Sequence, residues 1–249
     1  MGATSRERYA VVSCHVERPL DDDVWARFVA LQRRRPGGFG IAALMRPPDA
    51  AFAEDQELWL ERAHEAASLA PLGQHTHWTA PDHARPSGGG TGDRVLAEGM
   101  RLRELGLSPT LFCGGGWYTD VEVAEACAEL GYVDCTPRAS RPPYLAVGER
   151  WASLDDPAVV GLPSGRTLGA IATTHSLGDL ARSLPRRDLP ELVHVYFHDT
   201  DLLDGRRRAL LRLVLPALAR RAHVTDLDAL GARLLASAQR MAWDDVARL

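Results

Sequence analysis

The sequence has few cysteines and no long hydrophobic run. Its four cysteines, at positions 14, 113, 127 and 135, form no CxxC pair and are too sparse for a disulfide framework. We therefore expect reduced thiols and no zinc–thiolate site. No run of about 18 or more apolar residues is present, and residues 1–9 lack the apolar segment of a secretory signal. These absences predict a cytoplasmic protein without a membrane-spanning segment.

The sequence also lacks an excess of basic residues. It has 29 Lys and Arg residues against 33 Asp and Glu residues, which gives a formal net charge of −4. Nucleic-acid-binding domains usually concentrate positive charge, so this balance disfavours a nucleic-acid partner and favours a small-molecule or glycan substrate. The glycine-rich residues 88–92 lack the lysine of a P-loop and follow no strand directly, so we exclude a P-loop nucleotide site.

The sequence does contain a regular alternation of strand and helix patterns. Its 249 residues are 45% hydrophobic, enough for one large core, so we treat residues 1–249 as a single domain. Nearly continuous apolar runs, typical of strands buried on both faces, occur at residues 9–15, 39–45 and 192–197. Residues 137–174 are irregular and rich in Pro, Gly and Arg, and they are expected to form functional loops or short elements that the sequence does not resolve. The pattern predicts an α/β fold, a distorted (β/α) barrel of seven or eight units with its chemistry at the carboxyl ends of the strands.

Three histidines occur within residues 72–83. If residues 72–78 form a strand, the period of two places His75 and His77 on one face. Two imidazoles that converge near a strand end are candidate metal ligands, and a polar surface loop is the alternative. The metal site is favoured because two histidines on one face are difficult to bury without partners.

Polar side chains also follow other predicted strands. His15 and Glu17 come at the end of the first apolar run, although a capping or salt-bridge role for Glu17 is equally open. His198 and Asp199 close the strand at 192–197. Glycines at 114–116 follow another strand and either allow close approach of a ligand or form a tight strand-to-helix turn. One face of the barrel would thus collect most of the candidate polar residues.

The order of these segments resembles the polysaccharide deacetylase family, the NodB-homology or carbohydrate esterase family 4 group. Residues 13–17 are similar to its first motif, residues 74–78 to its second, residues 112–117 to its third and residues 195–199 to its last. The resemblance spans roughly residues 9–225. It implies a distorted (β/α) barrel and a metal-dependent hydrolase that removes an acetyl or formyl group from the nitrogen of a sugar or glycoconjugate precursor.

The chain departs from the family pattern at several motif positions. His15 stands where the family has its catalytic Asp, and Cys113 stands where it has an Arg. Arg141 opens an Arg-Pro-Pro-Tyr segment similar to the family's Arg-x-Pro-aromatic signature, but one strand later, so it is a candidate replacement. The second histidine of the family motif would fall at Thr79, and His77 would have to take its place.

The resemblance implies a metal site and a substrate-contacting set. His75, His77 and Glu17 would hold a divalent ion, zinc or alternatively cobalt or nickel, which polarises the acyl carbonyl. Residues of the second and third motifs would contact the sugar. The substrate-contacting set is Trp78, Gly115, Gly116, Trp117 and Tyr118.

The resemblance also implies catalytic roles. His198 would be the general acid that protonates the leaving amine, with Asp199 or Asp201 orienting it. His15 would be either the base or a ligand. Two other functions stay open: a catalytically degenerate barrel that binds a saccharide or partner without turnover and without a metal, and a different metal-dependent hydrolase on the same scaffold.

Overall fold

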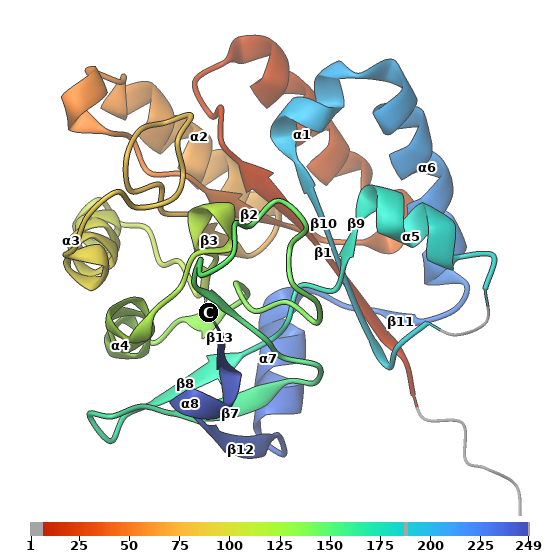
Figure 1. The fold of residues 1–249 in the computed structure, drawn as a ribbon. Coiled ribbons are helices and arrows are strands. Elements are labelled where there is room, and N and C mark those ends of the chain that lie inside the picture. The colour runs from red at the N-terminus through yellow and green to blue at the C-terminus, as the bar shows by residue number, and fades with distance from the viewer. Residues whose placement is uncertain (1–6, 187–188, 249) are drawn as a thin grey trace, which may run out of the picture.

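The computed structural model describes residues 7–186 and 189–248, and a mostly parallel β-sheet lies at its centre (Figure 1). Its strands are β1 (Tyr9–Val16), β2 (Ile41–Met45), β3 (Leu72–Gln74), β4 (Leu111–Phe112), β5 (Val133–Asp134), β6 (Trp151–Ala152), β7 (Ala158–Gly161), β8 (Thr167–Ala170), β9 (His175–Ser176), β10 (Leu192–His198), β11 (His223–Val224), β12 (Gln239–Ala242) and β13 (Ala247–Arg248). The order in the main sheet is β12-β7-β8-β5-β4-β3-β2-β1-β10-β9, with β11 paired to β1. β6 and β13 form a separate antiparallel pair.

Eight α-helices occur in the described residues, and their ends follow signals in the sequence. They are α1 (Asp22–Arg34), α2 (Gln56–Leu69), α3 (Thr91–Glu104), α4 (Val121–Leu130), α5 (Leu177–Ser183), α6 (Gly205–Ala219), α7 (Leu227–Leu235) and α8 (Trp243–Val246). The Asp21 side chain accepts a hydrogen bond from the Val24 backbone N–H and caps α1, and Gly131 ends α4 at φ +68°. None of the helices described is both long enough and apolar enough to cross a bilayer.

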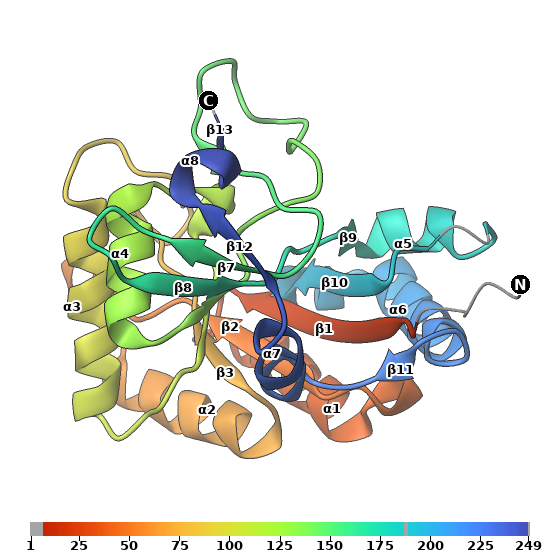
Figure 2. The same ribbon diagram turned by 90° about the horizontal axis from the view of Figure 1, so that it is seen from below.

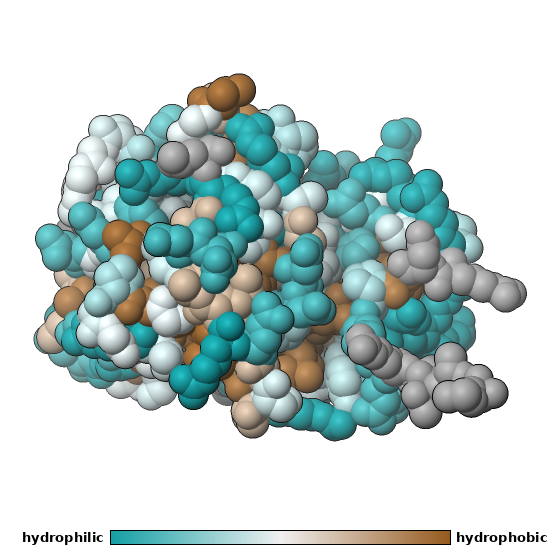
Figure 3. Space-filling view, turned by 60° about the horizontal axis from the view of Figure 1, so that its bottom comes forward, coloured by the Kyte–Doolittle hydropathy of each residue, from teal (hydrophilic) through white to brown (hydrophobic). Residues whose placement is uncertain are grey.

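The two faces of the sheet bury different side chains. Along β1, Val12 and Cys14 join the core between the sheet and α1, α2 and α6, whereas Val11 packs on the opposite, inner face. This alternation follows from the strand period of two. Helices cover the outer face (Figures 1 and 2), and hydrophobic side chains form only small groups on the surface seen in Figure 3. β1 is therefore buried on both faces, as its apolar run predicts.

The inner face is crowded. A Cβ on Gly73 would lie 2.4 Å from Leu44 Cδ2 and 2.8 Å from Leu111 Cβ, so a larger residue would not fit there without displacing its neighbours. Leu227 and Leu230 of α7 pack against the same inner cluster. The inner face of the sheet is thus a packed core.

The segment from Thr167 to Ser176 joins two parts of the sheet. Its first part, β8, pairs with β5, and its last part, β9, pairs with β10. β7 and β8 form an antiparallel hairpin that turns at Gly165, where φ is +87°. Residues 137–174 therefore contain short strands, the second of the two possibilities left open for this segment, and their Pro and Gly residues hid the strand pattern.

His194 lies inside β10 and is fully buried on the inner face of the sheet. Its pKa therefore reports how well this face excludes water. Its Nε2 is 2.9 Å from Ser13 Oγ, and its Nδ1 is 3.4 Å from Thr173 Oγ1. Burial, with a smaller contribution from the positive charge of Arg138, lowers the pKa of His194 to about 3. The folded protein therefore holds this imidazole neutral over most of the acidic range.

Replacing His194 should reduce the acid sensitivity of the fold. Between pH 6.5 and about 3 the unfolded chain binds more protons at this position than the folded protein, so lowering the pH favours unfolding. From pH 7 to pH 5 we expect the wild type to lose about 2 kcal/mol more unfolding free energy than His194→Gln. Urea unfolding of both proteins at both pH values measures this difference. Equal losses in the two proteins would show that His194 is not held neutral.

Candidate functional site

Four side chains meet at the carboxyl ends of β1, β3 and β10. The Oε1 atom of Glu17 lies 3.6 Å from His75 Nε2, 3.7 Å from His77 Nε2 and 3.7 Å from His198 Nε2. β3 ends at Gln74, so both histidines lie just beyond the strand rather than within it. The parallel sheet brings these strand ends to one edge, as the sequence predicts.

The two histidines after β3 leave lone pairs without partners. His75 Nδ1 lies 2.7 Å from the Cys113 carbonyl oxygen, and His77 Nδ1 lies 2.8 Å from the Pro81 carbonyl oxygen. A carbonyl can only accept, so each Nδ1 carries the hydrogen and Nε2 of the neutral ring carries a lone pair. Both Nε2 atoms are buried and have no hydrogen-bond partner. They converge, with a carboxylate oxygen, on one small space.

This donor set fits a divalent cation. Glu17, His75 and His77 form a group whose possible ligand atoms all lie within 4.8 Å of one another. Ligands of a tetrahedral zinc ion lie roughly 3.3 Å apart, so a small closure of the observed separations would suffice. A metal-binding imidazole usually donates the N–H of its other ring nitrogen to a carbonyl or carboxylate, as both of these histidines do through Nδ1.

The protonation states of these groups suit the same role. Burial lowers the pKa of His75, although Glu17 opposes that shift, which favours the neutral ring that a metal requires. Burial by itself would raise the pKa of Glu17, but the nearby His75 and His77 rings outweigh it and hold the pKa well below its usual range. The carboxylate is therefore anionic at neutral pH.

A buried ion pair positions the segment that carries Glu17. Arg46 follows β2, and its Nε donates to the Glu17 carbonyl oxygen at 3.1 Å. Its two terminal nitrogens bind both oxygens of Glu54 at 2.7 and 2.5 Å, and Trp59 Nε1 donates to the Arg46 carbonyl oxygen at 2.8 Å. A cavity of about 600 Å³ opens beside this pair, and its lining includes Glu17, Arg46, Glu54, Pro81 and Thr200.

His198 closes β10 at the edge of the cluster, and its side chain is 36% exposed. We expected Asp199 or Asp201 to orient its ring, but the structure gives both carboxylates other partners. Asp199 accepts from the Arg18 backbone N–H at 2.8 Å, and burial raises its pKa to about 6. Asp201 accepts from the backbone N–H of His198 at 3.2 Å and pairs with Arg207. The two carboxylates thus hold the backbone around the site.

His15 lies beneath the cluster and is buried. Its Nε2 is 3.6 Å from Cys113 Sγ, and its ring lies 4.5 Å from the His75 ring. The rings of Trp117 and Tyr196 are 5.1 and 5.2 Å away. Burial, reinforced by His75, lowers the pKa of His15 well below its usual value, and burial raises the pKa of the Cys113 thiol. A neutral imidazole and a neutral thiol therefore lie side by side beneath the cluster.

The glycines after β4 pack against the histidine segment. A Cβ on Gly115 would lie 2.7 Å from the Thr76 carbonyl oxygen and 2.8 Å from His77 Cδ2. Gly116 and Trp117 both adopt positive φ, +59° and +57°, within the short 3-10 turn η3 (Gly115–Trp117). The structure thus shows the tight turn rather than an open backbone, and this turn fixes the position of His77.

Two of the expected substrate-contacting residues bond to other parts of the protein. The ring centres of Trp78 and Tyr118 lie 5.1 Å apart, and both partly buried side chains pack against the core beside α3 and α4. Trp78 Nε1 donates to the Thr91 carbonyl oxygen at 3.1 Å, and the Tyr118 hydroxyl donates to Asp120 at 2.6 Å. Their polar atoms are therefore engaged in the protein itself.

Arg138, which we did not predict, packs against two rings behind the histidine cluster, whereas the predicted Arg141 bonds within its own loop. Arg141 is exposed and donates to the Ala146 carbonyl oxygen at 2.6 Å. The Arg138 guanidinium carbon lies 4.4 Å from the centre of the Trp117 ring and 4.9 Å from that of Tyr196. Its position shortly after β5 was the available signal, because other candidate residues also follow strand ends.

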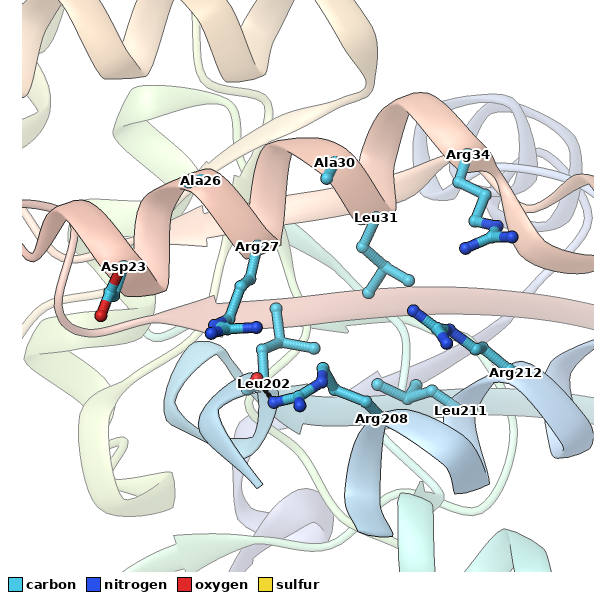
Figure 4. A pocket seen from close by; sticks show the side chains of 10 residues that line it. All are labelled: Asp23, Ala26, Arg27, Ala30, Leu31, Arg34, Leu202, Arg208, Leu211 and Arg212. Carbon is cyan, nitrogen blue, oxygen red and sulfur yellow. Dashed lines mark hydrogen bonds between the residues drawn. The ribbon is translucent and has the colours of Figure 1, made fainter. Parts of the chain in front are cut away.

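A separate hollow lies on the outside of the sheet, between α1 and α6 (Figure 4). Its volume is about 370 Å³, and several arginines from the two helices line it: Arg27, Arg34, Arg208 and Arg212. Its described lining includes no histidine. This hollow is therefore distinct from the cluster of Glu17 with the histidines.

Searches with the sequence found no matching family model and no matching curated protein. Two solved structures share the fold. A crystal structure of a candidate polysaccharide deacetylase from Mycobacterium smegmatis matches with a TM-score of 0.65 and 12% identity over 93% of this chain and 92% of that chain. The 4-alpha-glucanotransferase from Thermococcus litoralis matches with a TM-score of 0.58 and 12% identity over 93% of this chain, but only 39% of that chain. These likenesses show a deacetylase-like mixed α/β fold.

Proposed function

We propose that the protein is a metal-dependent hydrolase that removes an acetyl or formyl group from the nitrogen of a sugar or glycoconjugate precursor. The convergence of the unpartnered Nε2 atoms of His75 and His77 on Glu17 carries this proposal, and the deacetylase-like fold supports it. These three residues would hold zinc, or alternatively cobalt or nickel, and the ion would act as a Lewis acid toward the acyl carbonyl.

We infer that the curved sheet closes into a distorted (β/α) barrel of seven units within one domain. The segment from Thr167 to Ser176 would take the seventh strand position of this barrel, between β5 and β10. Between its two paired parts, the Thr173 backbone N–H donates to the Pro137 carbonyl oxygen at 2.8 Å, and that of Thr174 to the His194 carbonyl oxygen at 3.0 Å. These bonds support closure between β5 and β10.

The chain's own residues supply the remaining chemistry. Hydrolysis consumes one water, whose oxygen bonds to the acyl carbon as the C–N bond breaks and the amine leaves with a proton. We assign that proton to His198, which lies at the partly exposed edge of the cluster beside Glu17. His15 is the candidate base, and its buried contact with the His75 ring also suits a positioning role. We expect a small cytoplasmic glycan as substrate, without a nucleic-acid or membrane partner.

Replacing His198 separates catalysis from metal binding. We expect His198→Ala to retain zinc affinity and to lower the rate of acetate release from N-acetylated sugars by about 10²- to 10⁴-fold, the usual contribution of a general acid. Calorimetric zinc titration and an acetate assay measure the two effects. His223→Ala, at an exposed histidine on β11, is the matched control. A parallel loss of zinc affinity in His198→Ala would instead make His198 a ligand.

The second candidate is a barrel that binds a saccharide without turnover. The observation that favours it is the neutral, buried His15 beside Cys113, where the family has a catalytic carboxylate and an arginine. A binding module should retain an N-acetylated sugar unchanged, whereas a hydrolase should release acetate from it. Mass spectrometry of the sugar recovered from the protein distinguishes the two.

A further inference from the structure

The guanidinium of Arg138 is buried without an anionic partner. Only 8% of the residue is exposed, and its Nε and Nη1 atoms are buried with no hydrogen-bond partner. Across residues 7–186 and 189–248, no carboxylate forms an ion pair with it. Arginine is always protonated, so a positive charge with free donors lies inside the protein.

Contacts within the protein offset only part of the free-energy cost of burying this guanidinium. The rings of Trp117 and Tyr196 lie 4.4 and 4.9 Å from the guanidinium carbon and supply cation–π contacts, but Nε and Nη1 still have no hydrogen-bond acceptor. The charge acts on nearby groups: burial is the main cause of the lowered pKa values of His194 and His175, and Arg138 adds to both shifts. Buried polar groups are normally hydrogen-bonded, so an acceptor from outside the chain is expected.

Arg138 is separated from the histidine cluster by one layer of rings. Trp117 and Tyr196, which hold the guanidinium, also contact the His15 ring at 5.1 and 5.2 Å. The His15 ring in turn lies 4.5 Å from His75 and 5.2 Å from His198. A substrate whose acylamino group lies at Glu17 could therefore place a neighbouring substituent near Arg138.

We infer that Arg138 binds an anionic group, a carboxylate or a phosphate, of the N-acylated sugar. This inference rests on the proposed function and narrows its substrate class. The planar guanidinium fork matches both anions through paired hydrogen bonds. In an N-acylated hexosamine the carbons on either side of the acylamino carbon can carry such groups, as an anomeric phosphate or an ether-linked carboxylate.

The test compares three sugars that differ in charge. Zinc-loaded wild type, Arg138→Gln and Arg138→Lys are assayed with N-acetylglucosamine, N-acetylmuramic acid and N-acetylglucosamine 1-phosphate. We expect wild-type kcat/KM to be at least about tenfold higher for one of the anionic sugars than for the neutral sugar, the size of one charged hydrogen-bond pair. The preferred anionic sugar identifies carboxylate or phosphate. In Arg138→Gln the ratio of kcat/KM for the anionic sugar to that for the neutral sugar should fall to about one. In Arg138→Lys this ratio should fall only in part, because lysine keeps the positive charge but lacks the planar guanidinium.

Arg141→Gln is the matched control, since Arg141 is exposed, follows Arg138 by three residues and donates to the Ala146 carbonyl oxygen; its ratio should equal that of the wild type. No preference in the wild type, or a preference that survives Arg138→Gln, would overturn the inference. If Arg138→Gln does not fold, Arg138→Lys decides, and an unchanged ratio there contradicts the role of the fork.

A binding experiment separates this inference from the proposed function. If zinc-loaded wild type hydrolyses none of the three sugars, the proposed activity fails for them, but calorimetric titration with the same sugars still tests Arg138. Tighter binding of an anionic sugar that is lost in Arg138→Gln supports the anion subsite. Equal affinities for all three sugars in the wild type would overturn it.

Discussion

Replacing His75 and His77 together with alanine should abolish divalent-metal binding. Both Nε2 atoms face Glu17 without another partner, so the double variant removes two of the three donors and leaves one carboxylate. Zinc affinity should fall by more than about a hundredfold, because even outer-shell partners of a metal site contribute 10–100-fold. Competition with a fluorescent zinc chelator measures the affinity.

The third histidine of the same stretch provides the control. His83 is exposed and lies outside the cluster, so His83→Ala should bind zinc as the wild type does. The double variant should also unfold cooperatively without metal, because neither ring makes a hydrogen bond beyond its Nδ1 contact to a carbonyl. Retained zinc affinity in a folded double variant would exclude this site.

Replacing Glu54 with alanine should strongly destabilise the fold. Its pair with Arg46 has side-chain exposures of only 15% and 5%, and Glu54 also accepts from the Asp49 backbone N–H at 2.8 Å. Glu54→Ala leaves a buried guanidinium without its carboxylate, which typically costs about 3–5 kcal/mol of unfolding free energy. Urea unfolding at neutral pH measures this loss. Because Arg46 also holds the Glu17 carbonyl, zinc affinity should fall as well.

An exposed Arg–Glu ion pair provides the control for the stability change in Glu54→Ala. Arg101 and Glu104 lie 3.4 Å apart on α3 with side-chain exposures of 54% and 65%. Water already solvates both groups, so Glu104→Ala should change the unfolding free energy by less than about 1 kcal/mol. If Glu54→Ala costs no more than Glu104→Ala, the buried pair does not stabilise the fold as described.

The parts of the fold that could be predicted are those with local signals. The run at residues 9–15 gives β1, and Asp21 caps α1 through its own side chain. The strands β7 and β12 could not be predicted, since their pairing depends on segments far apart in the chain and carries little local pattern. Gly165 and the prolines near it point to a turn, but not to the strands on either side.

The candidate site also has parts that could be predicted from the sequence and parts that could not. The spacing of His75 and His77 placed both side chains together, and the parallel sheet added Glu17 and His198 from other strand ends. The roles of these side chains as ligands and acid are still predictions. The direction of the Trp78 side chain depends on the core beside α3, which no neighbouring residue indicates. Arg138 was missed because only the folded chain brings it to Trp117.

The most direct test of the metal site is the metal content of wild-type protein purified without chelators or an affinity-tag metal, measured by elemental mass spectrometry. The geometry of Glu17, His75 and His77 predicts about one divalent ion per chain. Protein that remains free of metal, even after incubation with zinc, cobalt or nickel, would contradict the proposed hydrolase.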